Sequence, residues 1–320
     1  MIYIVSEERD VTTNIVLEYI LSKKRKVKRI NNSKDSLISF DIDNIEQPQL
    51  NINKDVINSS DIVWLRRARL NLLPKELLVE DVIITDYLSR EENALNKSLE
   101  IFLKNRNNII GSYLKEVENY KITNLLLAKQ VGLKIPKTLV TSKKERAIEF
   151  FNQHKDIITK DLRYPVNLYF DKLAFVSKGT IKVKKKDLEN LDDYFFPIFF
   201  QENIRKYIEL RLFVFKKKVY TMAIFSQEDE QTKTDYRNFD KDNPNRLVPF
   251  QLPSDIEYKV IEFMSLANLD TGSIDIILNT DGEYIFLEVN PQGQIDWLSK
   301  SCHFYIERDI ANYLMKESED

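Results

Sequence analysis

Glycine is scarce in this sequence, with only 6 residues in a chain of 320. Average proteins contain roughly 7% glycine, several times more than this chain. A chain so poor in glycine is not collagen-like, linker-rich or built from glycine repeats. It also lacks the two familiar phosphate-binding loops, because neither G-x-G-x-x-G nor G-x-x-x-x-G-K-S/T occurs in it. If the chain binds a nucleotide, it does so by other means.

The remaining composition is that of a folded and nearly neutral protein. Apolar residues make up 43% of the chain, which is enough for a sizeable core and excludes disorder along the whole chain. Lys and Arg number 48 and Asp and Glu number 50, so the net charge of −2 argues against a general nucleic-acid binder. With Cys302 as the one cysteine and only two histidines, the chain can form neither an intramolecular disulfide nor a zinc site of the usual count.

The sequence also predicts the compartment. The apolar start, residues 1–5, is too short for a signal peptide. No apolar run approaches the roughly 20 residues that a membrane span needs. A single cysteine is typical of a reducing compartment. We therefore expect a cytoplasmic protein with neither a membrane nor a nucleic acid as partner.

The order of strand-like and helix-like segments predicts an α/β protein. Apolar runs at 1–5 and 62–65 flank a helix that Thr12 or Thr13 can cap, which indicates a small α/β domain ending near residue 85. A polar-faced helix at 87–102 follows as a connector. Residues 227–247 are polar and without periodicity, which predicts a mobile loop or lid. Further helices are expected at 115–133, 143–154, 256–267 and 305–315, and strands at 157–160, 173–176, 180–183, 198–201, 210–215 and 219–225.

The strongest chemical signal is a predicted hairpin over residues 273–290. If Asp281 and Gly282 form a two-residue turn, Asp275 lies directly opposite Glu288, and Asn290 lies on the same face. Two opposed carboxylates repel each other, and a divalent cation would remove that penalty. Three oxygen ligands suit Mg²⁺. The alternative is a solvent-facing strand surface that happens to be acidic, and a four-residue loop would break the direct opposition.

Basic and acidic residues elsewhere are weaker signals. Lys160 ends a predicted strand and Lys121 lies near the start of a predicted helix, where each could neutralise a phosphate or be an ordinary surface lysine. Glu209 and Arg211 share one face of a predicted strand. Glu209 could accept hydrogen bonds from a ribose and Arg211 could bind a phosphoryl group, or the two could form an ordinary ion pair. Arg237 lies in the predicted lid, where arginines are usually solvated.

Taken in order, these segments resemble the ATP-grasp ligases, and within them the peptide maturases that make graspetides (microviridin-type and grasp-with-spasm synthetases). The resemblance covers nearly the whole chain. It is carried by Val63-Trp64-Leu65-Arg66-Arg67, Glu118-Asn119-Tyr120-Lys121, Gln201-Glu202-Asn203-Ile204, Glu209-Leu210-Arg211, Asp235-Tyr236-Arg237, and Asp275 with Leu287-Glu288-Val289-Asn290-Pro291-Gln292-Gly293-Gln294.

The resemblance implies the ATP-grasp fold, in which an N-terminal α/β domain (1–110, with the connector helix) precedes two α+β subdomains (111–203 and 204–320) that sandwich ATP. It implies that Lys121 and Lys160 contact ATP phosphates, that Gln201, Glu202 and Ile204 line the adenine site, and that Glu209 holds the ribose. It also implies that Arg211 and Arg237 stabilise the transferred phosphoryl group, and that Asp275, Glu288 and Asn290 hold Mg²⁺. One departure is that the expected lid loop, residues 175–180, contains only one glycine.

The activity implied by the resemblance is ATP-dependent closure of ester or amide rings in a ribosomal precursor peptide with a leader and a core. Asp or Glu side chains of the peptide would be phosphorylated and then joined to Ser, Thr or Lys side chains. Two alternatives stay open: an ATP-grasp ligase that adds amino acids or glutamate to an acceptor, and a non-catalytic nucleotide- or peptide-binding protein. The oligomeric state is not fixed, with a homodimer among those allowed. Arg66 and Arg67 could recognise a substrate carboxylate, although a structural ion pair is the simpler interpretation.

Overall fold

The computed structural model describes residues 1–32, 36–41, 49–67, 69–73, 81–163, 167–170, 173–176, 179–226 and 245–318. The chain divides into two compact units that alternate along the sequence. Unit 1 contains Met1–Glu118, Leu269–Ser273 and Asn290–Asp320, and unit 2 contains Asn119–Asn268 and Ile274–Val289. The division into three parts expected from the sequence stays a prediction.

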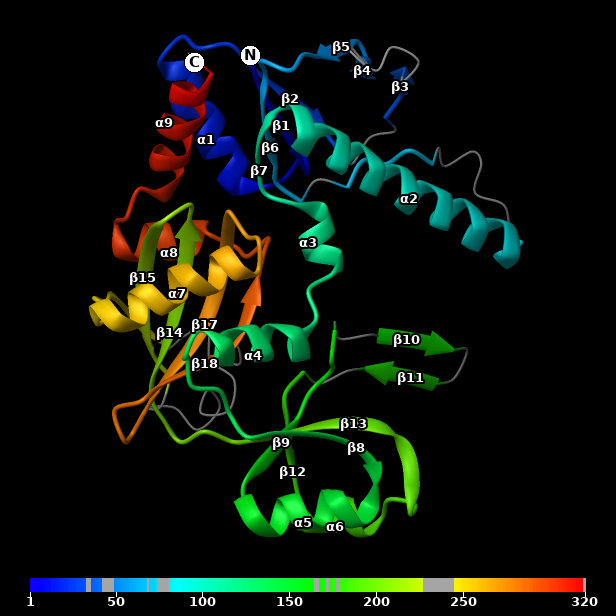
Figure 1. Ribbon diagram of the computed structural model, residues 1–320, viewed down its shortest axis with the longest axis vertical. Coiled ribbons are helices and arrows are strands. Elements are labelled where there is room, and N and C mark those ends of the chain that lie inside the picture. Colours follow the sequence, from blue (N-terminus) through cyan, green and yellow to red (C-terminus); the bar gives the residue numbers. More distant parts are fainter. Residues whose placement is uncertain are drawn as a thin grey trace. The chain divides into compact units, whose positions relative to one another are not determined.

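Unit 1 is built on a parallel sheet with the strand order β2-β1-β6-β7 (Figure 1). The strands are β1 (Ile2–Ser6), β2 (Val27–Asn31), β6 (Ile62–Leu65) and β7 (Asn108–Ile110). Both β1 and β6 are buried along their whole length, as expected for the inner strands of a parallel sheet. This confirms the two strands predicted for the N-terminal domain.

Helices and a small antiparallel sheet complete unit 1. Helix α1 packs against α9 (Figure 1). Helix α2 includes the predicted connector helix and extends it at both ends; Asp81 caps its start, and its Leu99 and Leu103 lie in the core of the unit. The helices are α1 (Val11–Ser22), α2 (Val82–Arg106), α3 (Tyr113–Val117), α8 (Asp296–Cys302) and α9 (Ile306–Glu317), and the small sheet contains β3 (Ile38–Asp41), β4 (Gln49–Ile52) and β5 (Asp55–Ile57).

The start of α1 differs from the sequence prediction. Its N-cap is Asp10 rather than Thr12 or Thr13, and Asp10 Oδ1 accepts a hydrogen bond from the Thr13 N–H at 2.7 Å. A carboxylate at this position satisfies a free backbone donor and interacts favourably with the positive end of the helix dipole. The prediction named the wrong cap because the apolar pattern of the helix begins only after Asp10.

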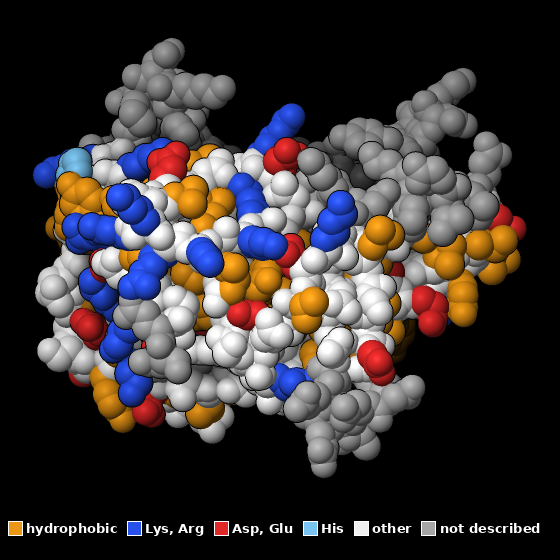
Figure 2. Space-filling view, turned by 90° about the horizontal axis from the view of Figure 1, so that it is seen from above, with side chains coloured by type: hydrophobic (Ala, Val, Ile, Leu, Met, Phe, Trp, Pro, Cys, Tyr) orange, Lys and Arg blue, Asp and Glu red, His pale blue; other side chains and the backbone are white. Residues whose placement is uncertain are grey.

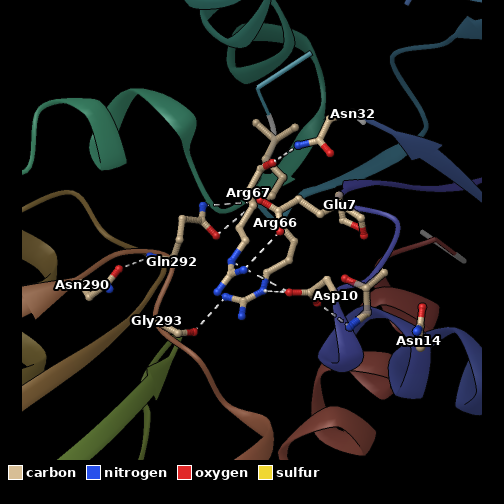
Figure 3. Close-up of polar contacts among 12 residues, drawn as sticks. Glu7, Asp10, Asn14, Asn32, Arg66, Arg67, Asn290, Gln292 and Gly293 are labelled. Carbon is tan, nitrogen blue, oxygen red and sulfur yellow. Dashed lines mark hydrogen bonds and ion pairs between the residues drawn. The ribbon is translucent and has the colours of Figure 1, made fainter. Parts of the chain in front are cut away.

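Buried polar contacts hold the segment after β18 within unit 1 (Figure 3). Gln292 is only 3% exposed, and its Nε2 donates to the carbonyl oxygens of Leu65 and Ser112, both at 3.3 Å. Its Oε1 accepts from the Arg67 N–H at 3.1 Å. Gly111 lies against the same carbonyl of Leu65 with a φ of +79°, and a Cβ there would overlap that oxygen. Only glycine therefore fits at this position.

Gly111→Ala should destabilise the protein, because both the backbone angle and the Leu65 carbonyl oppose a side chain. We expect a loss of more than about 2 kcal/mol of unfolding free energy in chemical denaturation. Gly132→Ala is the matched control: its φ is +80°, but the nearest atom to a new Cβ is Lys259 Cε at 3.7 Å. It should lose only about 1 kcal/mol. Equal losses in the two variants would contradict the steric argument.

Unit 2 contains an antiparallel sheet with the order β12-β9-β13-β8. Helices α5 and α6 cover one face of it, and a small core that includes Ala147, Leu188 and Phe200 lies beneath them (Figure 1). The elements are β8 (Thr138–Lys143), α5 (Lys144–His154), β9 (Ile157–Thr159), β12 (Ile181–Val183), α6 (Lys185–Glu189) and β13 (Tyr194–Glu202), with a separate hairpin of β10 (Asn167–Phe170) and β11 (Leu173–Val176).

A second sheet of unit 2 has the order β16-β15-β14-β17-β18. Helix α7 packs on it, with the Phe263 ring 4.8 Å from the Phe286 ring of β18. The predicted loop or lid at 227–247 falls mostly outside the described residues, and its last two residues already belong to β16. The elements are α4 (Lys121–Gln130), β14 (Lys206–Phe215), β15 (Lys218–Phe225), β16 (Arg246–Pro249), α7 (Ser254–Leu266), β17 (Thr271–Asn279) and β18 (Tyr284–Asn290).

The turn between β17 and β18 corrects the predicted two-residue loop. The Gly282 N–H donates to the Asn279 carbonyl at 3.2 Å, and the Asn279 N–H donates to the Glu283 carbonyl at 3.0 Å. Three residues, 280–282, therefore form the loop, and Gly282 closes it with a φ of +78°. Asn279 Oδ1 also accepts from the N–H groups of Asp281 and Glu283, which favours the longer loop.

The surface carries charges of both signs. Figure 2 shows Lys and Arg side chains with Asp and Glu among them on the face seen from above. The lysine run at 182–186 is exposed apart from Val183, and Lys182 pairs with Asp156 at 3.1 Å, as expected of a solvated face. In the part of the chain that the structure describes, no helix has both the length and the apolar character needed to cross a membrane.

Candidate functional site

A pocket in unit 2 collects residues from both of its sheets. Seven of the residues singled out in the sequence lie in its lining: Lys160, Gln201, Glu202, Ile204, Glu209, Asp275 and Glu288. They come from the ends of β9 and β13, the start of β14, and the paired strands β17 and β18. Strand pairing within each sheet and the approach of the two sheets therefore bring together side chains that are up to 128 positions apart in the sequence.

Apolar side chains also line the pocket. Ile158, Ile204, Ile277 and Leu287 contribute to its lining. Gln201 is 1% exposed and its Nε2 donates to Thr138 Oγ1 at 3.0 Å, so this polar side chain is held in place at the end of β13. An apolar lining with a few fixed polar groups can accept a flat ring.

Two acidic residues of the pocket, Asp275 and Glu288, are paired with basic residues. Arg211 is 8% exposed and its Nη1 donates to Asp275 Oδ1 at 2.7 Å. Lys121 Nζ lies 3.9 Å from Glu288 Oε2 and donates to the Arg163 carbonyl at 3.1 Å. These cations offset the repulsion that two carboxylates would otherwise experience in one pocket. The positive groups are thus held where an incoming anion could exchange for a carboxylate.

Glu209 is the most buried acid of the pocket, with 7% exposure. Its Oε1 accepts from Lys206 Nζ at 2.9 Å and from Ser226 Oγ at 2.7 Å. Burial raises the pKa of the Glu209 carboxyl, and the charge and hydrogen bond of Lys206 oppose that rise. Neither Lys206 nor Ser226 was predicted from the sequence as a site residue.

Oxygen donors suitable for a hard cation are present. Asp275 and Glu288 both line the pocket, and Asn290 ends the strand that carries Glu288. Asn290 Oδ1 accepts from the Gln292 N–H at 3.0 Å, which fixes the orientation of the amide. Carboxylate and amide oxygens suit Mg²⁺ rather than zinc. Among the described residues no three His, Cys, Asp or Glu side chains form a group that could hold a metal, so a cation here would also need the amide or oxygens of a ligand.

The structure says less about Lys160, Arg237 and the expected lid loop. Lys160 lies in the pocket lining with its Nζ 5.8 Å from the centre of the Phe199 ring. Arg237 falls outside the described residues. The expected lid loop at 175–180 is described only in part, because residues 177 and 178 fall outside as well.

Arg66 and Arg67 both lie in unit 1, in different environments (Figure 3). Arg66 is 3% exposed; its Nη1 donates to the Gly293 carbonyl at 3.0 Å, and its Nε lies 3.5 Å from Asp10 Oδ2. Arg67 is partly exposed and its Nη1 pairs with Glu7 at 3.2 Å. Burial lowers the pKa of Arg66, while Asp10 raises it. For Arg66 the geometry is that of a structural ion pair.

Arg66→Met should be strongly destabilising, since it removes the nearer cation of the buried Asp10 carboxylate and leaves the more distant Arg67 Nε, at 4.0 Å. We expect a loss of about 3 kcal/mol of unfolding free energy. Arg67→Met is the matched control, because its ion pair is partly exposed and should contribute less than about 1 kcal/mol. Denaturant titrations of both variants measure the difference, and similar losses would show that Arg66 has no special structural role.

Solved structures match the whole length of the chain. A RiPP-associated ATP-grasp ligase of Chryseobacterium gregarium, in complex with ADP and a leader and core peptide, is 28% identical with a TM-score of 0.84, and the match covers 99% of this chain and 96% of that one. The macrocyclase MdnC of Microcystis aeruginosa, bound with its precursor peptide MdnA, is 27% identical with a TM-score of 0.80 and 99% coverage of both chains. The ATP-grasp ligase PsnB, complexed with a precursor variant, Mg and ADP, is 16% identical with a TM-score of 0.75, covering 99% of this chain and 98% of PsnB.

No protein-family model matches the sequence, and no curated protein matches it. The solved structures nevertheless confirm the predicted fold: the chain is an ATP-grasp ligase in its architecture. Within that class it is similar, over its whole length, to the RiPP-associated branch that includes the graspetide ligases.

Proposed function

We propose that this protein is an ATP-dependent peptide maturase that closes ester or amide rings in a ribosomal precursor peptide. The observation that carries the proposal is the pocket of unit 2, in which a potential ribose acceptor, Glu209, and two potential metal ligands, Asp275 and Glu288, come together. The full-length similarity to two ligases bound to their precursor peptides supports the choice of a peptide with a leader and a core as substrate.

In this proposal ATP occupies the pocket. Gln201, Glu202 and Ile204 would surround the adenine, and Glu209 would accept hydrogen bonds from the ribose. Lys121 and Lys160 would neutralise phosphate charge. Lys121 already lies beside a carboxylate, so a phosphate could replace that carboxylate as its partner.

The donor set also fits a magnesium ion. Asp275, Glu288 and Asn290 would hold Mg²⁺, which when bound supplies positive charge to the phosphate oxygens. Arg211 now pairs with Asp275 and would become available to the transferred phosphoryl group, together with Arg237.

The proposed reaction has two steps. A carboxylate oxygen of a peptide Asp or Glu attacks the γ-phosphorus of ATP, the bond to the bridging oxygen breaks, and ADP leaves. A Ser or Thr oxygen, or a Lys nitrogen, of the same peptide then attacks the acyl carbon, and phosphate leaves as the nucleophile loses its proton to solvent. Each ring therefore costs one ATP and removes the elements of one water from the peptide.

Several further features belong to the same proposal. The pocket would be formed by the subdomains at 111–203 and 204–320, with 1–110 as the N-terminal domain. The protein would act in the cytoplasm on a peptide, without a nucleic acid or a membrane as partner, as a monomer or a homodimer.

The activity can be tested directly by mass spectrometry. Incubation with Mg-ATP and the precursor peptide encoded beside the gene should lower the peptide mass by one water for each ring. Omission of ATP is the control. An unchanged peptide would contradict the proposal, and a gain of mass on an acceptor would instead favour a ligase that adds amino acids.

Asp275→Asn tests the metal assignment, because it removes one of the two carboxylates proposed to hold the metal. We expect a decrease of at least tenfold in Mg-dependent ATP turnover and in the Mg-dependent part of ADP affinity, measured calorimetrically. Asp255→Asn is the matched control, since Asp255 lies on α7 with a side chain that is 65% exposed. Near-normal turnover in Asp275→Asn would show that the metal is held elsewhere.

A further inference from the structure

Two hydrogen-bond donors converge on a single oxygen of Glu209. Lys206 Nζ and Ser226 Oγ both donate to Oε1, at 2.9 and 2.7 Å. Neither donates to Oε2, and no described residue donates a hydrogen bond to that second oxygen. The carboxylate is therefore held by one oxygen and keeps the other as an acceptor.

The position of Lys206 is unusual for a strand residue. In a regular strand, residues 206 and 209 would point to opposite faces. The pairing of β14 with β15 begins only at Glu209, which pairs with Ile224, so Lys206 precedes this ladder. Its side chain is 7% exposed and reaches the face that carries Glu209.

Ser226 is placed by the same ladder. It follows β15 and lies two residues beyond Ile224, the partner of Glu209, so it is the diagonal neighbour of Glu209 on one face of the sheet. It is 0% exposed. Its hydroxyl is thus a fixed donor, part of the protein interior.

Burial makes these two donors necessary. A carboxylate that is 7% exposed is costly unless a cation or several donors compensate for the loss of water. Lys206 supplies the cation and Ser226 supplies a second bond. Lys206 also lines the pocket together with Glu209, whereas Ser226 is not among the lining residues.

We propose that Lys206 and Ser226 are positioning residues that hold Glu209 by Oε1 so that Oε2 accepts from the ribose hydroxyls and selects a ribonucleotide over a deoxynucleotide. The inference rests on the proposed function, because it requires the nucleotide to occupy this pocket. It goes further by assigning a specificity-determining role to two residues outside the family motifs.

The test compares the affinities of ADP and 2′-deoxy-ADP by calorimetry in the presence of Mg²⁺. The wild-type protein should bind ADP about tenfold more tightly, as expected for a hydrogen bond to a charged acceptor. Lys206→Met and Ser226→Ala should each bring this ratio down to about 3 or less. Lys206→Arg keeps a cation and should retain part of the preference.

Matched controls lie on exposed helix positions of unit 2. Lys129→Met on α4 and Ser265→Ala on α7 remove the same side-chain groups from solvent-exposed sites and should leave the ratio unchanged. Thermal unfolding of each variant checks that it is folded. If Lys206→Met does not fold, Ser226→Ala alone tests the inference, because it removes only one hydroxyl group.

The outcomes distinguish a failure of this inference from a failure of the proposed function on which it rests. If the wild-type protein binds no adenine nucleotide, the proposed function is wrong and this inference with it. If the wild-type protein binds ADP with a ribose preference that both folded variants keep, only the inference is wrong. A loss of affinity that is equal for both nucleotides would mean that Lys206 contacts another part of the ligand, and it would also overturn the proposal.

Discussion

Negative charge collected in one pocket is the constraint on which unit 2 is organised. Glu209, Asp275 and Glu288 line one pocket, and each has a protein cation within 4 Å. The cations come from α4 and β14, so Asp275 is paired only when β17 lies beside β14, and Glu288 only when α4 packs near β18. Such pairs contribute little net stability, because desolvation offsets the attraction between the charges. Under the proposed function, phosphates would replace the carboxylates and a metal would replace the cations with little reorganisation.

The sequence predicted most of the elements, and for clear physical reasons. Buried strands such as β1, β6, β14 and β15 have four to ten residues and contain apolar runs. Helices such as α5, α7 and α9 show a clear apolar stripe. Strands β3, β4 and β5 were not predicted, because they are short and half polar. The cap of α1 was wrong because the side chain that caps it lies outside the apolar pattern.

The candidate site was predictable only where a motif or an alternation marks the residues. Asp275 and Glu288 stand out as paired acids near an Asp-Gly turn, yet the turn has three residues because Asn279 supplies extra hydrogen bonds. Strand alternation assigns Lys206 to the face away from Glu209, so no pattern in the sequence could have joined the two. Ser226 becomes visible only through the ladder that pairs Glu209 with Ile224.

The alternation of the two units along the chain affects the order of events during synthesis on the ribosome. Unit 2 is complete once Val289 has emerged from the exit tunnel, whereas unit 1 still lacks its last two helices. Helix α1 is among the first segments to be translated, but α9, the helix it packs against, is among the last. Domains usually mature in the order in which they are translated. Here the unit whose translation begins first is the last to be completed. Its apolar surfaces stay exposed longest and are the ones that chaperones would protect.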